Sequence, residues 1–288
     1  MKKRNIFSWI VGILAIITVI VSAYFGLTEP NLNSGTSASR WSNQNSVSQI
    51  KRRGYLRVAV FGDLPPYGWV NSSGKRVGYD VYLAHRMAND LSVKIRFIQV
   101  NANNRVDTLN SNKADIVLAN FTVTPERKEV VDFAKPYMKV SVGVISPKKA
   151  PITSAAQLKG KKLIVTKGTT AENYFTQQKG VNLLKFDSKT QQFNALKNGR
   201  GAALADDNSY LYAWVKQNPN YTVGIKSIGP RQYVSPAVKK GNRSLLKWTN
   251  QEIMKLNRQS FFVKDYNKEL RPYFGKDIKP TDIILKQG

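Results

Sequence analysis

The sequence contains no cysteine and only one histidine, His85, among its 288 residues. Without cysteine the chain can form no disulfide bond, no thiol nucleophile, no cysteine-based metal site and no lipid anchor on a cysteine. A single histidine is too few for a histidine-based metal site, and it argues against a histidine-containing catalytic triad. These absences argue against thiol-based and histidine-based chemistry, and we expect no metal and no cofactor.

Acidic residues are also scarce: 18 Asp and Glu stand against 45 Lys and Arg, which gives a formal net charge of +27. Such a charge indicates contact with an anionic partner, such as a nucleic acid, a membrane surface or an acidic polymer. The choice among these partners depends on the compartment in which the protein works.

The N-terminus has an apolar run from about residue 6 to residue 27, preceded by three basic residues at positions 2–4. This pattern is typical of a secretory signal, with VSA at residues 21–23 as a cleavage site. A run of roughly 20 residues is also long enough to stay in the bilayer, so residues 1–27 are either a signal peptide or a membrane anchor. In both cases the rest of the chain is exported, to the cell surface or the wall or membrane. We therefore do not expect a nucleic-acid partner.

The remaining chain divides into a linker and two lobes. Residues 28–50 are rich in Ser, Asn, Thr and Gly, which predicts a flexible linker. From residue 51 onward, apolar runs that suit buried strands alternate with segments of helical periodicity. This alternation occurs twice and predicts an α/β fold of two lobes, each a mainly parallel sheet flanked by helices. The predicted lobe 1 comprises residues 51–141 and 233–288, and the predicted lobe 2 comprises residues 142–232.

Several polar residues follow predicted strands, at the positions where open α/β sheets bind ligands. Arg127 and Thr122 follow the strand over residues 114–119, and the guanidinium of the arginine suits a carboxylate. Residues 168–170, Gly-Thr-Thr, precede a helix whose free N–H groups favour an anion. Asp206 ends a further strand and offers an acceptor for an ammonium group. Together these groups could recognise a zwitterion held between two lobes, as in hinge-type binding proteins.

These residues also have interpretations that involve no ligand. Arg127 could be a surface ion-pair partner, and residues 168–170 could be a simple N-cap. Asp206, with Asp207 beside it, could cap the helix that follows. A third interpretation is an enzyme on the same two-lobe fold, such as a dehydratase or a wall-cleaving lyase, and a lyase would need a positioned glutamate as general acid or base. Glu172 is the one candidate that we can place between the lobes, and it lies in a first helical turn, where glutamate is expected anyway, so we expect no catalytic residue and no enzyme.

Three further residues are expected to serve the fold. Asp80 is predicted to cap the helix over residues 78–91. Tyr67 and Trp69 follow the first strand, where an aromatic residue is more often part of the core than a ligand contact.

Four segments, in this order, resemble the signatures of the polar amino-acid solute-binding proteins of ABC importers, solute-binding family 3. They are LRVAVFGDLPPYGWVNSSGKRVGYDVYLAHRMA, ADIVLANFTVTPERKEVVDFAKPYM, LIVTKGTTAENYF and GAALADDNSYLYAW. The resemblance covers about residues 51–275 and implies the two-lobe, type II periplasmic-binding-protein-like fold with the ligand in the interlobe cleft. The stretch NANNRVDTLNSNKADIVLANFT resembles most closely the cysteine- and cystine-binding branch. The basic charge is similar to that of the basic surface proteins of lactobacilli, which are linked to cystine uptake and have been proposed as adhesins.

The resemblance implies a role for each matching residue. Arg127 would bind the α-carboxylate of an amino acid, with Thr122 and the backbone at Thr170. Asp206 would bind the α-ammonium group, helped by the Asn120 carbonyl and Thr122. Arg105 matches a position that some members direct toward the ligand side chain, such as the second carboxylate of cystine or an acidic amino acid. The predicted ligand-binding residues are Phe61, Arg105, Asn120, Phe121, Thr122, Arg127, Gly168, Thr169, Thr170 and Asp206.

The resemblance implies a monomeric receptor, most closely for L-cystine or L-cysteine, that closes on its ligand and delivers it to an ABC permease in the membrane. Members from single-membrane bacteria usually carry a lipid-anchoring cysteine, which this chain lacks. Retention would then depend on the N-terminal segment or on attraction to anionic cell-wall polymers. Two alternatives remain open: a receptor for glutamate, glutamine or another polar amino acid, and a basic surface adhesin for anionic or matrix polymers.

Overall fold

The structure is a computed structural model, and it describes residues 45–276 and 278–285. The predicted signal peptide or anchor and the first part of the predicted linker lie outside these residues. Within the described ranges, no helix has the length and apolar character needed to span a membrane.

The end of the predicted linker is helical rather than flexible. Helix α3 (Val47–Arg53) begins inside that range, and the side chain of Ser46 caps it by accepting from the Gln49 N–H. Ile50 is fully buried, so this segment belongs to the folded protein. The buried carboxylate of Asp115 accepts hydrogen bonds from Arg53 and from Arg57, which ties the end of the helix to the first strand. A linker that extends to residue 50 is therefore wrong for its last residues.

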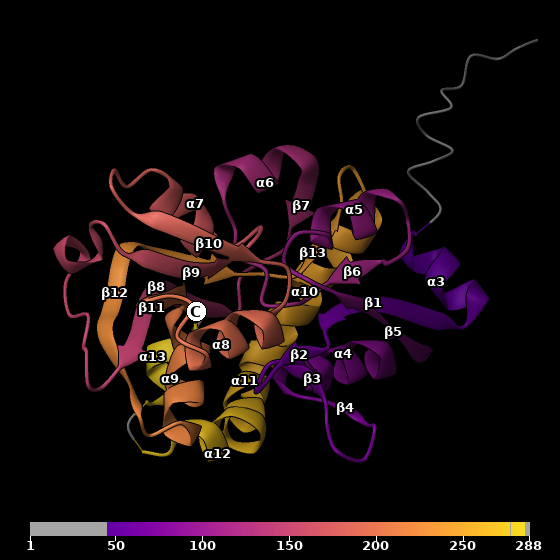
Figure 1. The fold of residues 1–288 in the computed structure, drawn as a ribbon. Coiled ribbons are helices and arrows are strands. Elements are labelled where there is room, and N and C mark those ends of the chain that lie inside the picture. Colours follow the sequence, from indigo (N-terminus) through magenta and orange to yellow (C-terminus); the bar gives the residue numbers. More distant parts are fainter. Residues whose placement is uncertain (1–44, 277, 286–288) are drawn as a thin grey trace, which may run out of the picture. The chain divides into compact units, whose positions relative to one another are not determined.

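Two five-stranded sheets form the framework of the described residues (Figure 1). The first sheet has the strand order β5-β1-β6-β13-β7, and we call the part built on it lobe 1. The second has the order β10-β9-β11-β8-β12, and we call the part built on it lobe 2. The strands of lobe 1 are β1 (Tyr55–Phe61), β5 (Lys94–Val100), β6 (Ile116–Val117), β7 (Val131–Phe133) and β13 (Ala237–Lys239). Those of lobe 2 are β8 (Met138–Pro147), β9 (Lys162–Thr166), β10 (Asn182–Phe186), β11 (Ala203–Asp207) and β12 (Tyr221–Val234).

Each sheet mixes parallel and antiparallel pairs, so neither is mainly parallel. In lobe 1, β1 runs parallel to β5 and β6, whereas β13 runs antiparallel to β6 and β7. In lobe 2, β9 runs parallel to β10 and β11, whereas β8 runs antiparallel to β11 and β12. The βαβ units predicted from the alternation are therefore confined to β1, β5 and β6 in lobe 1 and to β9, β10 and β11 in lobe 2.

Helices cover the sheets of both lobes. In α4, Val81, Ala84 and Ala88 are buried at helical spacing, which explains the packing of this helix on β1 and β5. The helices of lobe 1 are α3, α4 (Tyr79–Asp90), α5 (Arg105–Asn110), α6 (Pro125–Val130), α10 (Arg243–Arg258) and α11 (Phe261–Asp265). Those of lobe 2 are α7 (Thr170–Thr176), α8 (Lys189–Lys197), α9 (Asn208–Gln217) and the 3-10 helix η1 (Ala155–Leu158). A small antiparallel sheet, β2 (Asp63–Leu64), β3 (Gly68–Val70) and β4 (Arg76–Val77), follows β1.

The strands β8 and β12 and the C-terminal segment contact both lobes. The β8–β12 pair extends from Met138 opposite Val234 to Pro147 opposite Tyr221, and the predicted lobe boundaries fall within it. The C-terminal segment continues through the π-helix η2 (Tyr266–Leu270), α12 (Arg271–Phe274) and α13 (Pro280–Ile283). Helix α12 contacts α9 of lobe 2, and α13 contacts β8.

Candidate ligand-binding site

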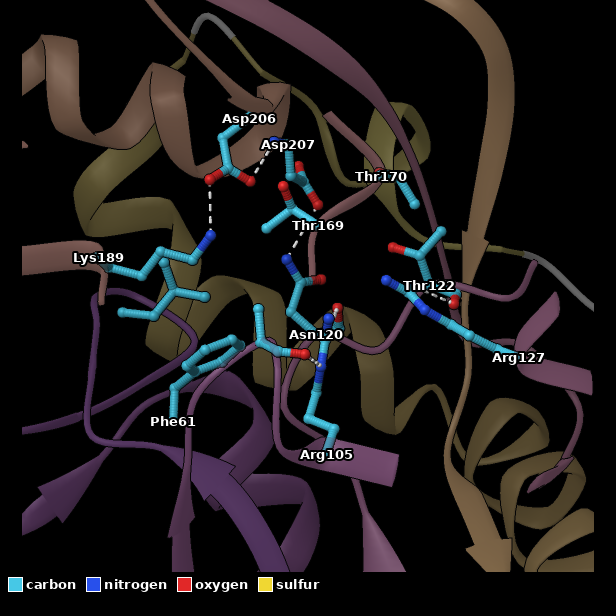
Figure 2. Close-up of a pocket in the computed structure, with 12 residues that line it drawn as sticks. Phe61, Arg105, Asn120, Thr122, Arg127, Thr169, Thr170, Lys189, Asp206 and Asp207 are labelled. Atoms are coloured by element: carbon cyan, nitrogen blue, oxygen red, sulfur yellow. Dashed lines mark hydrogen bonds and ion pairs between the residues drawn. The ribbon is translucent and has the colours of Figure 1, made fainter. Parts of the chain in front are cut away.

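A small cavity of about 20 Å³ lies between the two lobes, where strands of both sheets end (Figure 2). Phe61 ends β1 and Asn120 follows β6 in lobe 1, whereas Thr169 follows β9 and Asp206 lies near the end of β11 in lobe 2. The site thus lies beyond the carboxyl ends of the parallel strands, as expected for open α/β sheets. The lining residues are Phe61, Leu64, Ala102, Arg105, Asn120, Thr122, Arg127, Thr169, Thr170, Lys189, Asp206 and Asp207.

Eight of the ten residues predicted from the sequence line this cavity. The two that do not are Phe121 and Gly168, and both contact the arginines of the site. The Phe121 ring is buried and lies 4.5 Å from the Arg105 guanidinium and 5.0 Å from that of Arg127. The Gly168 carbonyl accepts from the same two guanidinium groups. Both residues therefore contact the lining arginines without lining the cavity themselves.

Arg127 is the cation whose donors remain partly available. Its backbone N–H donates to the cap residue Thr124 of α6, and Pro125 opens this helix, as the sequence suggests. The guanidinium donates to the Thr122 carbonyl at 2.6 Å and to the Gly168 carbonyl at 2.8 Å. Burial lowers the pKa of Arg127 to about 10, so the group stays charged at neutral pH. Five N–H groups are present on a guanidinium, and those left over can bind a carboxylate.

Arg105 has a different use for its donors. Nε donates to the Ala102 carbonyl, Nη1 to the carbonyls of Ala119 and Asn120, and Nη2 to that of Gly168, at 3.0 to 3.2 Å. Burial lowers the pKa of this side chain well below its usual value, and the nearby charge of Arg127 lowers it further. The guanidinium therefore fixes the backbone of lobe 1 and connects it to lobe 2. The role toward the ligand side chain implied by the resemblance stays a prediction.

The turn that carries Asn120 is strained. Ala119 and Asn120 have φ values of 39° and 43°, in the left-handed region that non-glycine residues rarely occupy. The Asn120 N–H donates to the buried carboxylate of Asp80 at 2.8 Å, and Arg105 holds the carbonyls. Asn120 Nδ2 donates to Asp207 at 2.9 Å, whereas its buried Oδ1 has no hydrogen-bond partner among the described residues. An acceptor is thereby left free beside the cavity.

The prediction that Asp80 caps its helix is wrong. The cap position of α4 is Gly78, with φ 121°. Glycine suits this position because an added Cβ would lie 2.5 Å from the Tyr67 carbonyl oxygen. Asp80 lies in the first turn of α4, two residues after the cap, is fully buried, and accepts from the Tyr137 hydroxyl at 2.7 Å as well as from the Asn120 N–H. Burial raises its pKa to about 6 although both hydrogen bonds lower it. Its function in the structure is to support the strained turn.

Of two neighbouring aspartates, one caps the helix that follows and the other lines the cavity. Asp207 caps α9 by accepting from the Ser209 N–H at 2.8 Å, and burial raises its pKa to about 6. Asp206 lines the cavity, and one of its oxygens pairs with Lys189 Nζ at 2.6 Å (Figure 2). Asp206 and Lys189 are both almost completely buried.

Sequence reasoning missed Lys189 as a site residue. The available signal is its position: Lys189 is the first residue of α8, directly after the cap Ser188. A cation at the N-terminus of a helix is disfavoured by the helix dipole, so a lysine there needs a compensating partner. Asp206 is that partner, and it comes from a strand 17 residues further along the chain.

The Gly-Thr-Thr stretch does form an N-cap, and it also lines the cavity. Thr169 caps α7 by accepting from the Glu172 N–H at 3.1 Å, while Thr170 donates to Gln232 of β12 at 2.8 Å. The carboxylate of Glu172 accepts from the Gly168 N–H at 2.7 Å and pairs with Lys185 at 2.9 Å. Glu172 is therefore engaged in holding the turn.

The two aromatic residues after β1 do not line the cavity. Tyr67 is fully buried and its hydroxyl donates to Ser209 of lobe 2 at 2.6 Å. Trp69 makes an edge-to-face contact with Tyr273 at 5.7 Å. In the described part of the chain, no group of three or more His, Asp or Glu residues is arranged to hold a metal ion.

Comparisons with known proteins identify the family. The chain matches the bacterial extracellular solute-binding proteins, family 3, over residues 56–272. It belongs to this family. A solved structure of the solute receptors for L-cysteine of Neisseria gonorrhoeae is 49% identical, with a TM-score of 0.82, over 83% of this chain and 99% of that chain. The cysteine-binding protein from Campylobacter jejuni is 46% identical, with a TM-score of 0.82, over 84% of this chain and 99% of that chain.

A relative named for a different ligand covers even more of the chain. The ABC transporter glutamine-binding protein GlnH of Bacillus subtilis (strain 168) is 31% identical over 274 residues, which is 93% of this chain and 98% of that protein. These findings confirm the predicted family and the two-lobe α/β fold class. They also confirm that this solute-binding protein is related to transport proteins rather than to enzymes, and the extracellular family agrees with predicted export.

Proposed function

We propose that this solute-binding protein is the amino-acid-binding component of an ABC importer, and that its ligand is L-cysteine or L-cystine. The ligand class is favoured by the two cysteine-binding proteins at 49% and 46% identity. The glutamine-binding relative, at 31% identity, matches over nearly its full length and supports only a polar amino acid as the ligand. The choice of cysteine or cystine therefore rests on the likeness to the two cysteine-binding proteins.

The observation that carries the proposal is the pair of unused polar groups in one buried cavity. Arg127 retains donors that suit a carboxylate, and the Oδ1 atom of Asn120 is a buried acceptor without a partner among the described residues. A buried unsatisfied acceptor costs about 1–3 kcal/mol, which an ammonium donor would recover. Figure 2 shows Asn120 between Arg127 and the Asp206 carboxylate. An amino-acid zwitterion has the two charged groups that this arrangement requires.

We assign the groups of the ligand accordingly. Arg127 binds the α-carboxylate together with Thr122 and the backbone N–H of Thr170, and Asp206 and Asn120 bind the α-ammonium group. Phe61 forms a wall. Each charge-assisted hydrogen bond contributes roughly 1.5–3 kcal/mol. Because these residues come from both lobes, the ligand favours the closed arrangement, which the permease then opens to release it.

The site is tested by isothermal titration calorimetry on the full-length protein in mild detergent, after unfolding and refolding to remove any carried-over amino acid. Cysteine, cystine, glutamine, glutamate, arginine and histidine are titrated. We expect micromolar or tighter binding of cysteine or cystine, lost in Arg127→Ala and retained in Lys128→Ala, an exposed neighbour on the same helix. Tight binding of glutamine instead would keep the receptor and change its ligand. Binding of no amino acid would refute the receptor.

A second candidate function, a surface adhesin, is favoured by the net charge of +27. The same charge would hold an exported protein on anionic wall polymers. Exposed charges are screened over about 8 Å at physiological ionic strength, so such adhesion should be lost as salt is added. Amino-acid binding in a buried cavity should not respond in this way. Retention on isolated cell walls, measured against salt concentration with wild type and Arg127→Ala, separates the two functions.

A further inference from the structure

Lys189 places a buried positive charge at one end of the candidate site. Its Nζ donates to Asp206 at 2.6 Å and to the Tyr210 hydroxyl at 3.3 Å. An ammonium group has three donors, and the described residues provide no third partner. Nζ also lies 5.8 Å above the centre of the Phe61 ring, which lines the same cavity. Figure 2 shows Lys189 and Arg127 on opposite sides of the pocket.

The charges that line the cavity do not cancel. Three cations, Arg105, Arg127 and Lys189, stand against two carboxylates, Asp206 and Asp207. The buried carboxylate of Asp80 lies behind the cavity and offsets the charge of Arg105, so the excess of positive charge is local. The excess is greatest at Asp206, where the α-ammonium group of the ligand would join an ammonium that is already bound. A buried charge without a partner is strongly disfavoured, so a ligand with an additional negative charge fits better.

The surroundings of Lys189 indicate which anion this is. Phe61, Leu64 and Ala102 are apolar lining residues of the same cavity, and Lys189 has a single donor to offer. A carboxylate presents about four acceptor positions and would leave most of them unsatisfied there. A thiolate is a single sulfur atom, and a neighbouring lysine favours its formation because it stabilises the anion. We propose that this site binds L-cysteine as the thiolate, with its sulfur against Lys189, an inference that rests on the amino-acid receptor proposed above.

The proposal has a direct consequence for protons. Free cysteine has a thiol pKa of about 8.5, so at pH 7 it must release about one proton to the solvent when it binds as a thiolate. Other titratable or charged groups also face the ligand, and their protonation can respond to any amino acid. They are Arg105, Arg127, Lys189, Asp206, Asp207 and Tyr210. Serine presents the same α-groups and a hydroxyl that does not ionise, so subtracting the serine result removes their contribution.

The experiment is calorimetry on the full-length protein in detergent, with a reductant present, in buffers of different ionisation enthalpy between pH 6 and pH 8. We expect cysteine to release about one proton more than serine at pH 7, and its affinity relative to serine to rise about tenfold per pH unit. In Lys189→Met, the excess proton release should disappear and the preference for cysteine over serine should fall about 10- to 100-fold. Lys189→Arg should retain the preference. Lys197→Met removes an exposed lysine from the same helix and should behave as wild type.

Each outcome separates this inference from the receptor on which it rests. Equal proton release by cysteine and serine, with either of them binding tightly, would overturn the thiolate and leave the receptor intact. Cystine binding more tightly than cysteine would also overturn it, because cystine has no thiol. A cysteine preference that survives in Lys189→Met would overturn the role of Lys189. Should Lys189→Met fail to fold, the wild-type proton count and Lys189→Arg still decide. If no amino acid binds, the proposed receptor itself fails.

Discussion

At Gly168 the backbones of the two lobes come close together, and the guanidinium groups of Arg105 and Arg127 both donate to the Gly168 carbonyl. Its φ is +73°, and an added Cβ would lie 2.7 Å from Asn103 Cα and 2.9 Å from the Ala102 carbonyl oxygen. Asn103 and Ala102 belong to lobe 1, whereas Gly168 follows β9 of lobe 2. Gly168→Ala should therefore strain lobe 2 locally and, in addition, keep the lobes apart.

The two effects differ in size and in the property that they change. An alanine in the left-handed region costs about 1–2 kcal/mol, which appears in the stability of the fold. Separating the lobes breaks the hydrogen bonds from Arg105 and Arg127 to the Gly168 carbonyl, each charge-assisted and worth roughly 1.5–3 kcal/mol. A loss of about 3–6 kcal/mol in the closed arrangement corresponds to an affinity that is about 100-fold to about 10,000-fold weaker.

Gly199→Ala is the matched control for this prediction. Gly199 also lies in lobe 2 with φ +65°, but no described atom lies within 4 Å of an added Cβ. Thermal unfolding should show a similar loss of stability in both variants. Calorimetry with the tightest-binding amino acid should show normal affinity in Gly199→Ala and the large loss only in Gly168→Ala. If Gly168→Ala binds as tightly as the control, the close approach at Gly168 is not needed for binding and our interpretation of it is refuted.

Three further predictions concern buried polar groups. Asp115→Ala leaves Arg53 and Arg57 without their shared buried carboxylate and should lower the free energy of unfolding in urea by about 3–5 kcal/mol, with ligand affinity unchanged. Tyr67→Phe removes a buried interlobe hydrogen bond and should weaken ligand binding by about 2- to 10-fold in calorimetry; unchanged affinity would show that this bond does not contribute to closure. Neither oxygen of the fully buried Asp265 has a partner among the described residues, and burial raises its pKa well above the usual value. The folded protein thus binds a proton at Asp265 more tightly than the unfolded chain does, so the free energy of unfolding should fall as pH rises from about 4. Asp80 and Asp207, whose pKa values are raised to about 6, add to this slope up to about pH 6. Asp265→Asn should flatten the dependence in urea titrations from pH 4 to pH 8, and an unchanged slope would contradict this assignment.

Much of the site follows from the sequence because its residues lie at strand ends. The carboxyl end of a strand can be located from an apolar run and the turn after it, and this is enough to place Phe61, Asn120, Thr169 and Asp206 near one another. The same reasoning places Arg127 shortly after that strand, and in the structure it lies in α6, the helix that follows β6. The lobes could be separated for a similar reason, since the alternation of strands and helices occurs twice.

The parts that escaped prediction depend on contacts between distant segments. Nothing local indicates that Asp80 supports the turn at Asn120, 40 residues away, instead of capping its own helix. The end of the linker cannot be placed from the sequence, because Ser46 and Ile50 follow a stretch of linker composition and only the structure shows that they are buried. Arg105 likewise uses its donors on four backbone carbonyls that come from three separate segments of the chain. Such roles are set by tertiary packing and have no period or motif.

The contacts between the lobes also indicate where specificity must lie. Tyr67 donates to Ser209, and Asp63 accepts from the Thr190 N–H at 3.1 Å, so several interlobe hydrogen bonds join protein groups alone. Such bonds stabilise the closed arrangement equally for every amino acid and cannot discriminate among them, because specificity is a difference between affinities. Arg127 and Asp206 cannot distinguish amino acids either, since all amino acids share the α-carboxylate and α-ammonium groups assigned to these two residues. Discrimination is left to lining residues that are not assigned to the α-groups. Lys189, which pairs with Asp206, is one of these, and it carries a charge and a donor without a partner among the described residues.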